Sequence, residues 1–404
     1  MVRVLLRRRL RGPSVVLLAA LLVLLTVGSG TIWWLQPGTP DGFYAAADTF
    51  EGSSLETIAS GTLLRSEPFD RGLPDNVRAW RVLYSSTDAG GRPVAVSGLV
   101  LEPTDPHDGP RPLIAIAHGS TGVDESCAPS LAARPLAPLG GVEQALNAGY
   151  AVAATDYLGL GTPGPHPYLI GSASAHAVLD SLRSAKQLIE VDPDRLAIWG
   201  FSQGGHAALF AAEQAPAYAP ELNIEGVVTF APAADLAEII ETSQGTVVGT
   251  LMVVSAAVSW SDARDDLLLD EVIEPGSVDI ARDIAQRCLD PTSLPASVLQ
   301  SIQLRDEVSP LGSPDTAHWA PFLAANSPTG HLDVPLLVLQ GEEDPIIRPE
   351  ITRAHVEARC AAGGEVELRV LEGIGHFTLT RRTAGDAAQW TQARFDGAPV
   401  TSSC

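Results

Sequence analysis

The sequence Arg195-Leu-Ala-Ile-Trp-Gly-Phe-Ser-Gln-Gly-Gly-His-Ala-Ala-Leu-Phe210 holds a G-x-S-x-G pentapeptide between two segments of different character. The apolar run Leu196 to Trp199 is typical of a buried strand. A helix is predicted from Gln203 to Ala215, ending before Pro216. A strand, a sharp turn and a helix in this order present a nucleophilic serine at the tip of the turn.

The serine of this turn is Ser202, with the elbow glycines Gly200 and Gly204 two residues away on either side. The turn closes tightly, so side chains at the two glycine positions would obstruct it. The N-terminus of the following helix points at the serine, where its N–H groups and dipole favour negative charge. Ser202 is therefore the predicted nucleophile.

A serine nucleophile needs a general base, and the base needs an orienting acid. In α/β-hydrolases the acid and then the histidine follow the serine along the chain, each on a loop after a strand. The predicted strand Val334–Gln340 is followed by Asp344, and the predicted strand Val366–Leu371 is followed by His376. Asp344 and His376 are thus the expected acid and base.

Other residues compete for both roles. Glu342 and Glu343 precede Asp344 on the same loop, but the Gly-x-x-Asp spacing favours the aspartate; an aspartate before proline is also typical of a plain turn. His206 lies one helical turn beyond Ser202, over the next turn and away from the hydroxyl. His166 and His176 flank a loop and a helix start, where capping or packing is expected.

The transition state of acyl transfer needs N–H donors for its oxyanion. The segment His118-Gly-Ser-Thr-Gly122 follows the predicted strand Pro112–Ala117 and can supply one donor. We expect that donor to be the N–H of Ser120, with Thr121 as the alternative. The second expected donor is the N–H of Gln203, directly after the nucleophile.

Composition excludes several classes of function. The net charge of the 404 residues is −22, so the surface repels phosphate backbones and no nucleic-acid partner is expected. Lys186 is the only lysine, which leaves no P-loop lysine, little room for Schiff-base chemistry and one candidate for a Ser-Lys dyad. Its place in a helical pattern favours a solvated surface residue.

No metal or cofactor site is expected. The chain has no H-E-x-x-H motif and no C-x-x-C pair. Gly159-Leu-Gly-Thr-Pro-Gly164 matches G-x-G-x-x-G, but Asp156-Tyr-Leu separates it from the preceding strand and prolines interrupt a helix start. This segment is predicted to be a rigid loop near the mouth of the site.

The N-terminus has the pattern of a targeting segment. Five arginines precede an apolar run from Pro13 to Leu35, and Trp33-Trp34 stands at its far end. A bilayer span takes about 20 residues, so the run is long enough. Residues 1–36 are expected to be a signal anchor or a signal peptide, with Val27–Gly30 a poor cleavage site. The anchor is favoured, membrane association through this segment is possible, and the remainder is exported in either case.

The chain has four cysteines, which suits an oxidising compartment and leaves three possible pairings: Cys127, Cys288, Cys360 and Cys404.

Strand and helix patterns alternate along most of the chain, which predicts an α/β fold with a mostly parallel central sheet. Residues 37–76 read as a connector and N-terminal extension, and residues 77–230 and 332–404 as two parts of the core. Between 231 and 331 the alternation fails and helical patterns dominate, in a stretch too long for a plain loop. We expect a helical cap, or lid, inserted above the sheet.

These features together resemble the secretory lipase family, the lipase-A-like α/β-hydrolases, from about Asp41 to the C-terminus. The resemblance is carried by several motifs: Asp41-Gly-Phe-Tyr44, Gly61-Thr-Leu-Leu-Arg-Ser66, the strand pair around Asp88, Cys127-Ala-Pro-Ser130, Asp156-Tyr157 with Gly159 and Gly161, Gly200 to Gly205, Asn326-Ser-Pro328, Gly341 to Pro349 and Gly375-His376.

The resemblance implies an α/β-hydrolase fold, hydrolysis of carboxylic esters including acylglycerols, and a cap that shapes an acyl tunnel. It also implies pairing of Cys127 with Cys288, which ties the oxyanion loop to the cap, and of Cys360 with Cys404. A peptidase or amidase with the same Ser-His-Asp groups, and a catalytically silent binding protein with this fold, are the alternatives. The expected ligand is a small-molecule or lipid ester.

Overall fold

The computed structural model describes residues 42–44, 55–309 and 314–404. The predicted targeting segment, residues 1–36, lies outside them. Among the described residues, no helix has both the length and the apolar character needed to cross a membrane.

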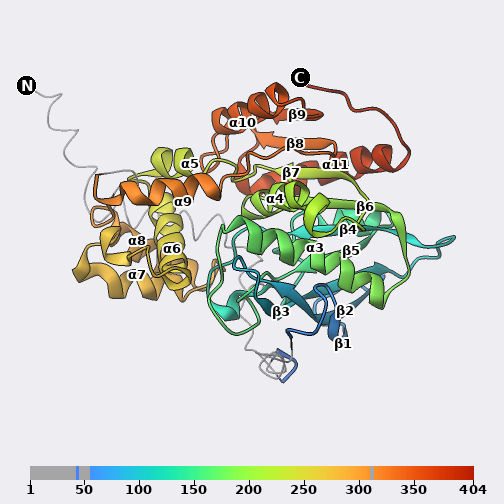
Figure 1. The fold of residues 1–404 in the computed structure, drawn as a ribbon, viewed down its shortest axis with the longest axis horizontal. Coiled ribbons are helices and arrows are strands. Elements are labelled where there is room, and N and C mark those ends of the chain that lie inside the picture. Colours follow the sequence, from blue (N-terminus) through green and yellow to red (C-terminus); the bar gives the residue numbers. More distant parts are fainter. Residues whose placement is uncertain (1–41, 45–54, 310–313) are drawn as a thin grey trace, which may run out of the picture.

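The described part of the chain is built on a sheet of nine strands in the order β1-β2-β3-β5-β4-β6-β7-β8-β9 (Figure 1). Strands β1 to β3 and β5 pair antiparallel, and all pairs from β5 through β4 to β9 are parallel. The strands are β1 (Leu63–Phe69), β2 (Val77–Thr87), β3 (Pro93–Pro103), β4 (Arg111–Ala117), β5 (Ala151–Thr155), β6 (Val191–Phe201), β7 (Ile224–Phe230), β8 (Leu336–Gly341) and β9 (Val366–Leu371).

Helices cover both faces of this sheet. Successive side chains of a strand point to opposite faces, so Leu113 and Ala115 of β4 enter one core and Ile114 and Ile116 the other. One core contains residues of α3 (Gly171–Leu188) and α4 (Gln203–Tyr218), and the other contains residues of α2 (Val142–Asn147) and α11 (Leu379–Phe395). Helix α10 (Pro349–Ala361) connects β8 to β9. The mostly parallel α/β fold is confirmed.

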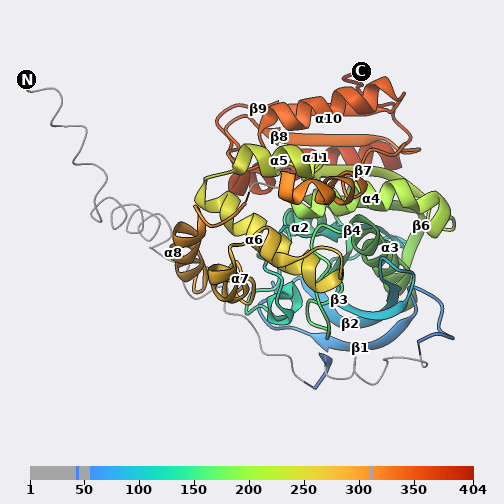
Figure 2. The same ribbon diagram turned by 60° about the vertical axis from the view of Figure 1, so that its left-hand side comes forward.

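The chain between β7 and β8 forms helices, as the sequence predicted for 231–331. Figures 1 and 2 show α6, α7 and α8 grouped together on one side of the molecule, away from β9 and α10. Their apolar side chains belong to the same core cluster as those of α2 and α11. The helices are α5 (Leu236–Ser243), α6 (Val247–Ala263), α7 (Val278–Ala285), α8 (Leu294–Leu304) and α9 (Ala320–Ala325).

One local prediction was wrong. Helix α4 does not end before Pro216 but continues to Tyr218. A proline costs the helix its own N–H bond, yet this loss falls in the last turn, and Ala219 N donates to the Ala215 carbonyl to close the end. The expected connector at 37–76 also contains strand β1, whose residues pair with β2 at the edge of the sheet.

Candidate active site

The turn after β6 forces Ser202 into a backbone conformation that few residues other than glycine adopt. Its φ is 54° and its ψ is −113°. A Cβ on Gly200 would lie 2.0 Å from the Gly204 carbonyl oxygen, and a Cβ on Gly204 would lie 1.9 Å from the Ala117 oxygen. Only glycine fits at either position, because the obstructing atoms belong to the backbone.

The structure brings Ser202, His376 and Asp344 into one hydrogen-bonded chain. His376 Nε2 lies 3.1 Å from Ser202 Oγ, and His376 Nδ1 lies 2.7 Å from Asp344 Oδ2. All three residues are buried, between 4% and 6% exposed. Because Nδ1–H donates to the carboxylate, Nε2 is free to accept the serine proton.

The loop after β8 fixes the orientation of Asp344. Its Oδ1 accepts hydrogen bonds from the backbone N–H groups of Ile346 and Ile347, at 2.8 and 2.9 Å. These bonds occupy one carboxylate oxygen and leave Oδ2 directed at His376. The alternatives Glu342 and Glu343 are exposed.

Two aromatic rings flank His376, and no sequence motif predicted a role for either. The Phe201 ring centroid lies 4.8 Å from that of His376, and the Phe377 centroid lies 5.5 Å away, edge-on. Phe377 is 79% exposed, which is unusual for a phenylalanine. Phe201 occupies the first variable position of the G-x-S-x-G motif, but only the folded structure shows that its ring contacts His376.

The segments expected to supply the oxyanion donors lie next to each other. Helix α4 begins at Gln203, so the Gln203 N–H has no partner within its own helix. The close approach of Gly204 to Ala117 brings the loop after β4 against this helix start. On that loop Ser120 Oγ lies 2.6 Å from the Tyr168 hydroxyl. The donor roles of Ser120 and Gln203 remain predictions, as does Thr121 as the alternative.

Three other histidines are fully buried near this site. Burial lowers the pKa of each to about 4: His118, His166 and His206. His206 Nε2 lies 2.8 Å from the Asn326 carbonyl oxygen, so its ring joins α4 to the end of α9 rather than to Ser202. His166 bonds the side chain of Gln203, a contact that the sequence did not predict.

The buried carboxylate of Asp156 links the Asp-Tyr motif to the Cys-Ala-Pro-Ser motif through hydrogen bonds from Ser130. This carboxylate accepts from the N–H of Ser130 at 3.0 Å, from the Ser130 hydroxyl and from the Ser97 hydroxyl at 2.7 Å. Burial raises the pKa of Asp156 to about 6, although these hydrogen bonds oppose the shift. The carboxylate joins β3, the loop after β5 and the loop that carries Cys127.

The disulfides join Cys127 to Cys288 and Cys360 to Cys404, the pairing that the resemblance implied. Beside the first, the N–H of Leu289 donates to the Thr121 carbonyl at 2.8 Å. The loop after β4 is thus held to the chain after α7 by a covalent bond and a hydrogen bond.

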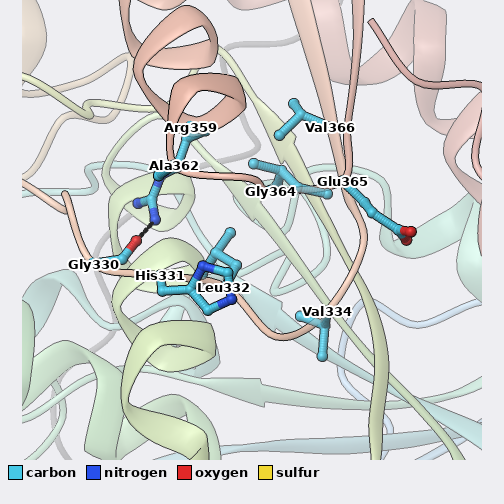
Figure 3. Close-up of a pocket in the computed structure, with 10 residues that line it drawn as sticks. Gly330, His331, Leu332, Val334, Arg359, Ala362, Gly364, Glu365 and Val366 are labelled. Atoms are coloured by element: carbon cyan, nitrogen blue, oxygen red, sulfur yellow. Dashed lines mark hydrogen bonds between the residues drawn. The ribbon is translucent and has the colours of Figure 1, made fainter. Parts of the chain in front are cut away.

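Two cavities lie elsewhere in the described part of the chain, and neither is lined by Ser202, Asp344 or His376. One, of about 10 Å³, lies between residues 330–336 and the junction of α10 with β9, where Arg359 donates to the Gly330 carbonyl (Figure 3). The other, of about 190 Å³, lies among α5, α6 and residues 305–309.

The Gly159–Gly164 segment is a loop, and the next helix begins only at Gly171. No cluster of three potential metal ligands occurs in the described ranges.

Comparisons with known proteins find a matching family, similar sequences and similar structures. The family model for secretory lipase matches residues 139–403. Lipase 6 of Candida albicans is 26% identical over 93% of this chain and 85% of its own length. A "probable inactive lipase" of Mycobacterium tuberculosis is 27% identical over 87% of this chain and 82% of its own.

Among solved structures, Candida antarctica lipase A matches with a TM-score of 0.74 at 19% identity, over 91% of this chain and 89% of its own. The rice cell wall degrading esterase LipA of Xanthomonas oryzae matches with a TM-score of 0.67 at 19% identity, over 84% and 98%. Both have the fold described above.

Proposed function

Because this chain belongs to the secretory lipase family and is a carboxylic ester hydrolase of the α/β-hydrolase fold, we propose that it cleaves its esters through an acyl-enzyme on Ser202. The observation that carries the proposal is the continuous hydrogen-bonded chain from Ser202 Oγ through His376 to Asp344. A silent binding protein would not need this geometry.

In the first half-reaction, Ser202 Oγ attacks the ester carbonyl carbon while its proton passes to His376 Nε2. The carbonyl oxygen becomes an oxyanion, which the N–H groups of Gln203 and Ser120 hold. Collapse of this intermediate breaks the bond to the alcohol oxygen, and His376 returns the proton to the leaving alcohol. Asp344 stabilises the imidazolium throughout and keeps its charge.

In the second half-reaction, a water molecule loses a proton to His376 and attacks the acyl carbon. The second oxyanion uses the same donors. Its collapse breaks the bond to Ser202 Oγ, the serine recovers the proton from His376, and the carboxylic acid leaves. Each cycle therefore consumes one water and releases one alcohol and one acid.

Acylglycerols are the proposed substrates, and the helices between β7 and β8 are the proposed cap that shapes the acyl site. The family and its lipase relatives support this substrate class. Export is proposed as well, since the family is secretory and all four cysteines form disulfides, which persist in oxidising compartments.

The experiment compares Ser202→Ala with the wild type. Its turnover of a p-nitrophenyl ester should fall by roughly three to six orders of magnitude with the fold retained. Ser181→Ala, which removes a buried hydroxyl from α3, is the matched control and should stay active. A fluorophosphonate should label Ser202, located by peptide mapping. Labelling of another serine would overturn the mechanism, and turnover of a p-nitroanilide as fast as of the ester would favour an amidase.

A further inference from the structure

Residues 166–168 form a short loop segment that contacts helix α6 of the predicted cap as well as Ser120 and Gln203, the two expected oxyanion donors. Helix α6 holds this segment from one side. Ser259 Oγ donates to the His166 carbonyl at 2.5 Å and accepts from the Tyr168 N–H at 3.0 Å. Trp260 Nε1 donates to the Tyr168 carbonyl at 2.7 Å. All four residues are at most 3% exposed, so water does not compete for these bonds.

The first side chain of the segment contacts the residue after the nucleophile. His166 Nδ1 lies 2.8 Å from the Leu158 carbonyl oxygen and must carry the proton, because a carbonyl only accepts. In the neutral ring Nε2 is then an acceptor, and Gln203 Nε2 lies 3.1 Å from it. The Gln203 Oε1 is buried without a partner in the described part of the chain. The bond to His166 therefore holds the Gln203 amide.

The second side chain of the segment contacts the loop after β4. The Tyr168 hydroxyl lies 2.6 Å from Ser120 Oγ, and Tyr168 is 3% exposed. Ser120 itself is only partly buried. Its position therefore depends on a partner fixed by the core, and Tyr168 is that partner.

We propose that residues 166–168 form a clamp that sets the separation of the two oxyanion donors and links it to the position of α6. His166 acts through Gln203 and Tyr168 through Ser120. Both are positioning residues that touch no reacting atom. This inference rests on the proposed function, since it assigns a purpose to contacts around the donors of that reaction.

The contacts of the clamp meet a requirement of oxyanion stabilisation. Oxyanion stabilisation depends on donors that are already in position before charge develops, and a displaced donor loses much of its effect. Two donors from different segments need a common element to fix their spacing. The clamp contacts both through side chains only two residues apart, and burial keeps His166 neutral near pH 7, as the acceptor that Gln203 needs.

The test of the Tyr168 arm is a double-mutant cycle of Tyr168→Phe and Ser120→Ala. Each variant removes one partner of the same hydrogen bond. We expect kcat on p-nitrophenyl acetate to fall roughly tenfold in each, with KM little changed, because a misplaced donor costs less than a missing one. The double variant should also lose roughly tenfold and not a hundredfold, since only one bond is shared. A boronic acid that forms a tetrahedral adduct on Ser202 should bind correspondingly more weakly.

Tyr150→Phe is the control for loss of a buried tyrosine hydroxyl. Tyr150 donates to the Ala388 carbonyl of α11, on the opposite side of the sheet from α3 and α4. It should change thermal stability without changing kcat or boronate binding. Gln203→Met tests the His166 arm, since it keeps the backbone N–H and removes the amide; it should reproduce the kcat effect.

The link to α6 is tested with Ser259→Ala, and Ser261→Ala on the same helix is the matched control. Loss of the clamp should lower kcat equally for acetate and for long-chain esters, because both use the same donors. An effect confined to long-chain esters would mean that Ser259 only shapes the acyl site and would overturn the link.

Additive effects of Tyr168→Phe and Ser120→Ala, or unchanged kcat and boronate binding, would overturn the clamp while Ser202-dependent esterase activity stood. Absence of any Ser202-dependent activity in the wild type would instead overturn the proposed function. The two failures are therefore distinguishable.

Discussion

Lowering the pH from 7 toward 4.5 should destabilise this protein steeply, because several histidines are buried in neutral form. Burial lowers the pKa of His118, His166 and His206 from 6.5 to about 4, and that of His355 to about 3. At a pH between these folded-state pKa values and 6.5, the unfolded chain binds more protons at these histidines than the folded chain does. The stabilisation is thus complete above pH 6.5 and is lost as the pH falls toward the folded-state pKa values.

The magnitude follows from the size of these shifts. Lowering the pKa of His206 from 6.5 to about 4 corresponds to about 3 kcal/mol of stability once the group is titrated through the whole range. Asp156 acts in the opposite direction, because burial raises its pKa from 3.8 to about 6 and the folded chain then holds the extra proton. Burial also lowers the pKa of His176 and raises the pKa of Asp180 and Glu213. Five histidines are thus opposed by three carboxyls, so the unfolded chain still binds more protons near pH 5, and each neutral buried histidine contributes a slope of roughly 1.4 kcal/mol per pH unit.

The assay is urea unfolding followed by tryptophan fluorescence at steps between pH 4.5 and 7.5. His206→Gln, which can still donate to the Asn326 carbonyl, should reduce the slope of unfolding free energy against pH by about 1.4 kcal/mol per unit, one proton's share. Tyr150→Phe removes a buried hydrogen bond without a group that titrates here, and should lower the free energy equally at every pH. An unchanged slope in His206→Gln would refute the assignment of a neutral buried histidine.

Three further outcomes are expected. Asp344→Asn should lower kcat roughly ten-thousandfold by favouring the wrong histidine tautomer, whereas Glu343→Gln should cost under about tenfold; kinetics with the reverse ranking would move the acid to Glu343. Gly204→Ala should prevent the elbow from forming, since its Cβ would meet a backbone oxygen at 1.9 Å, and a soluble variant that a fluorophosphonate still labels at the wild-type rate would contradict this. Cys127→Ser should lower stability by roughly 2–5 kcal/mol and loosen acyl-chain selectivity, whereas Cys360→Ser should lower stability alone; melting curves and an ester panel separate the two.

The sequence alone predicted the elements whose signals are local. The apolar run, the G-x-S-x-G turn and the helix after it are adjacent in the chain, so their chemistry could be recognised without the fold. The sequence also predicted the order of Ser202, Asp344 and His376, each after a strand of the parallel part of the sheet, because parallel strands end at the same edge. The pairing of the cysteines came from the family resemblance, since spacing left three pairings open.

Only the tertiary structure determined which side chains support this site. The Phe201 ring beside His376, the Asp156 carboxylate on Ser130 and the segment at 166–168 join residues that are 26 to 175 positions apart. Such contacts leave no periodic or local pattern, because each partner follows the pattern of its own strand, helix or loop. The sequence alone therefore predicted Ser202, Asp344 and His376, whereas the side chains that contact them and the expected oxyanion donors are brought together only when distant segments pack.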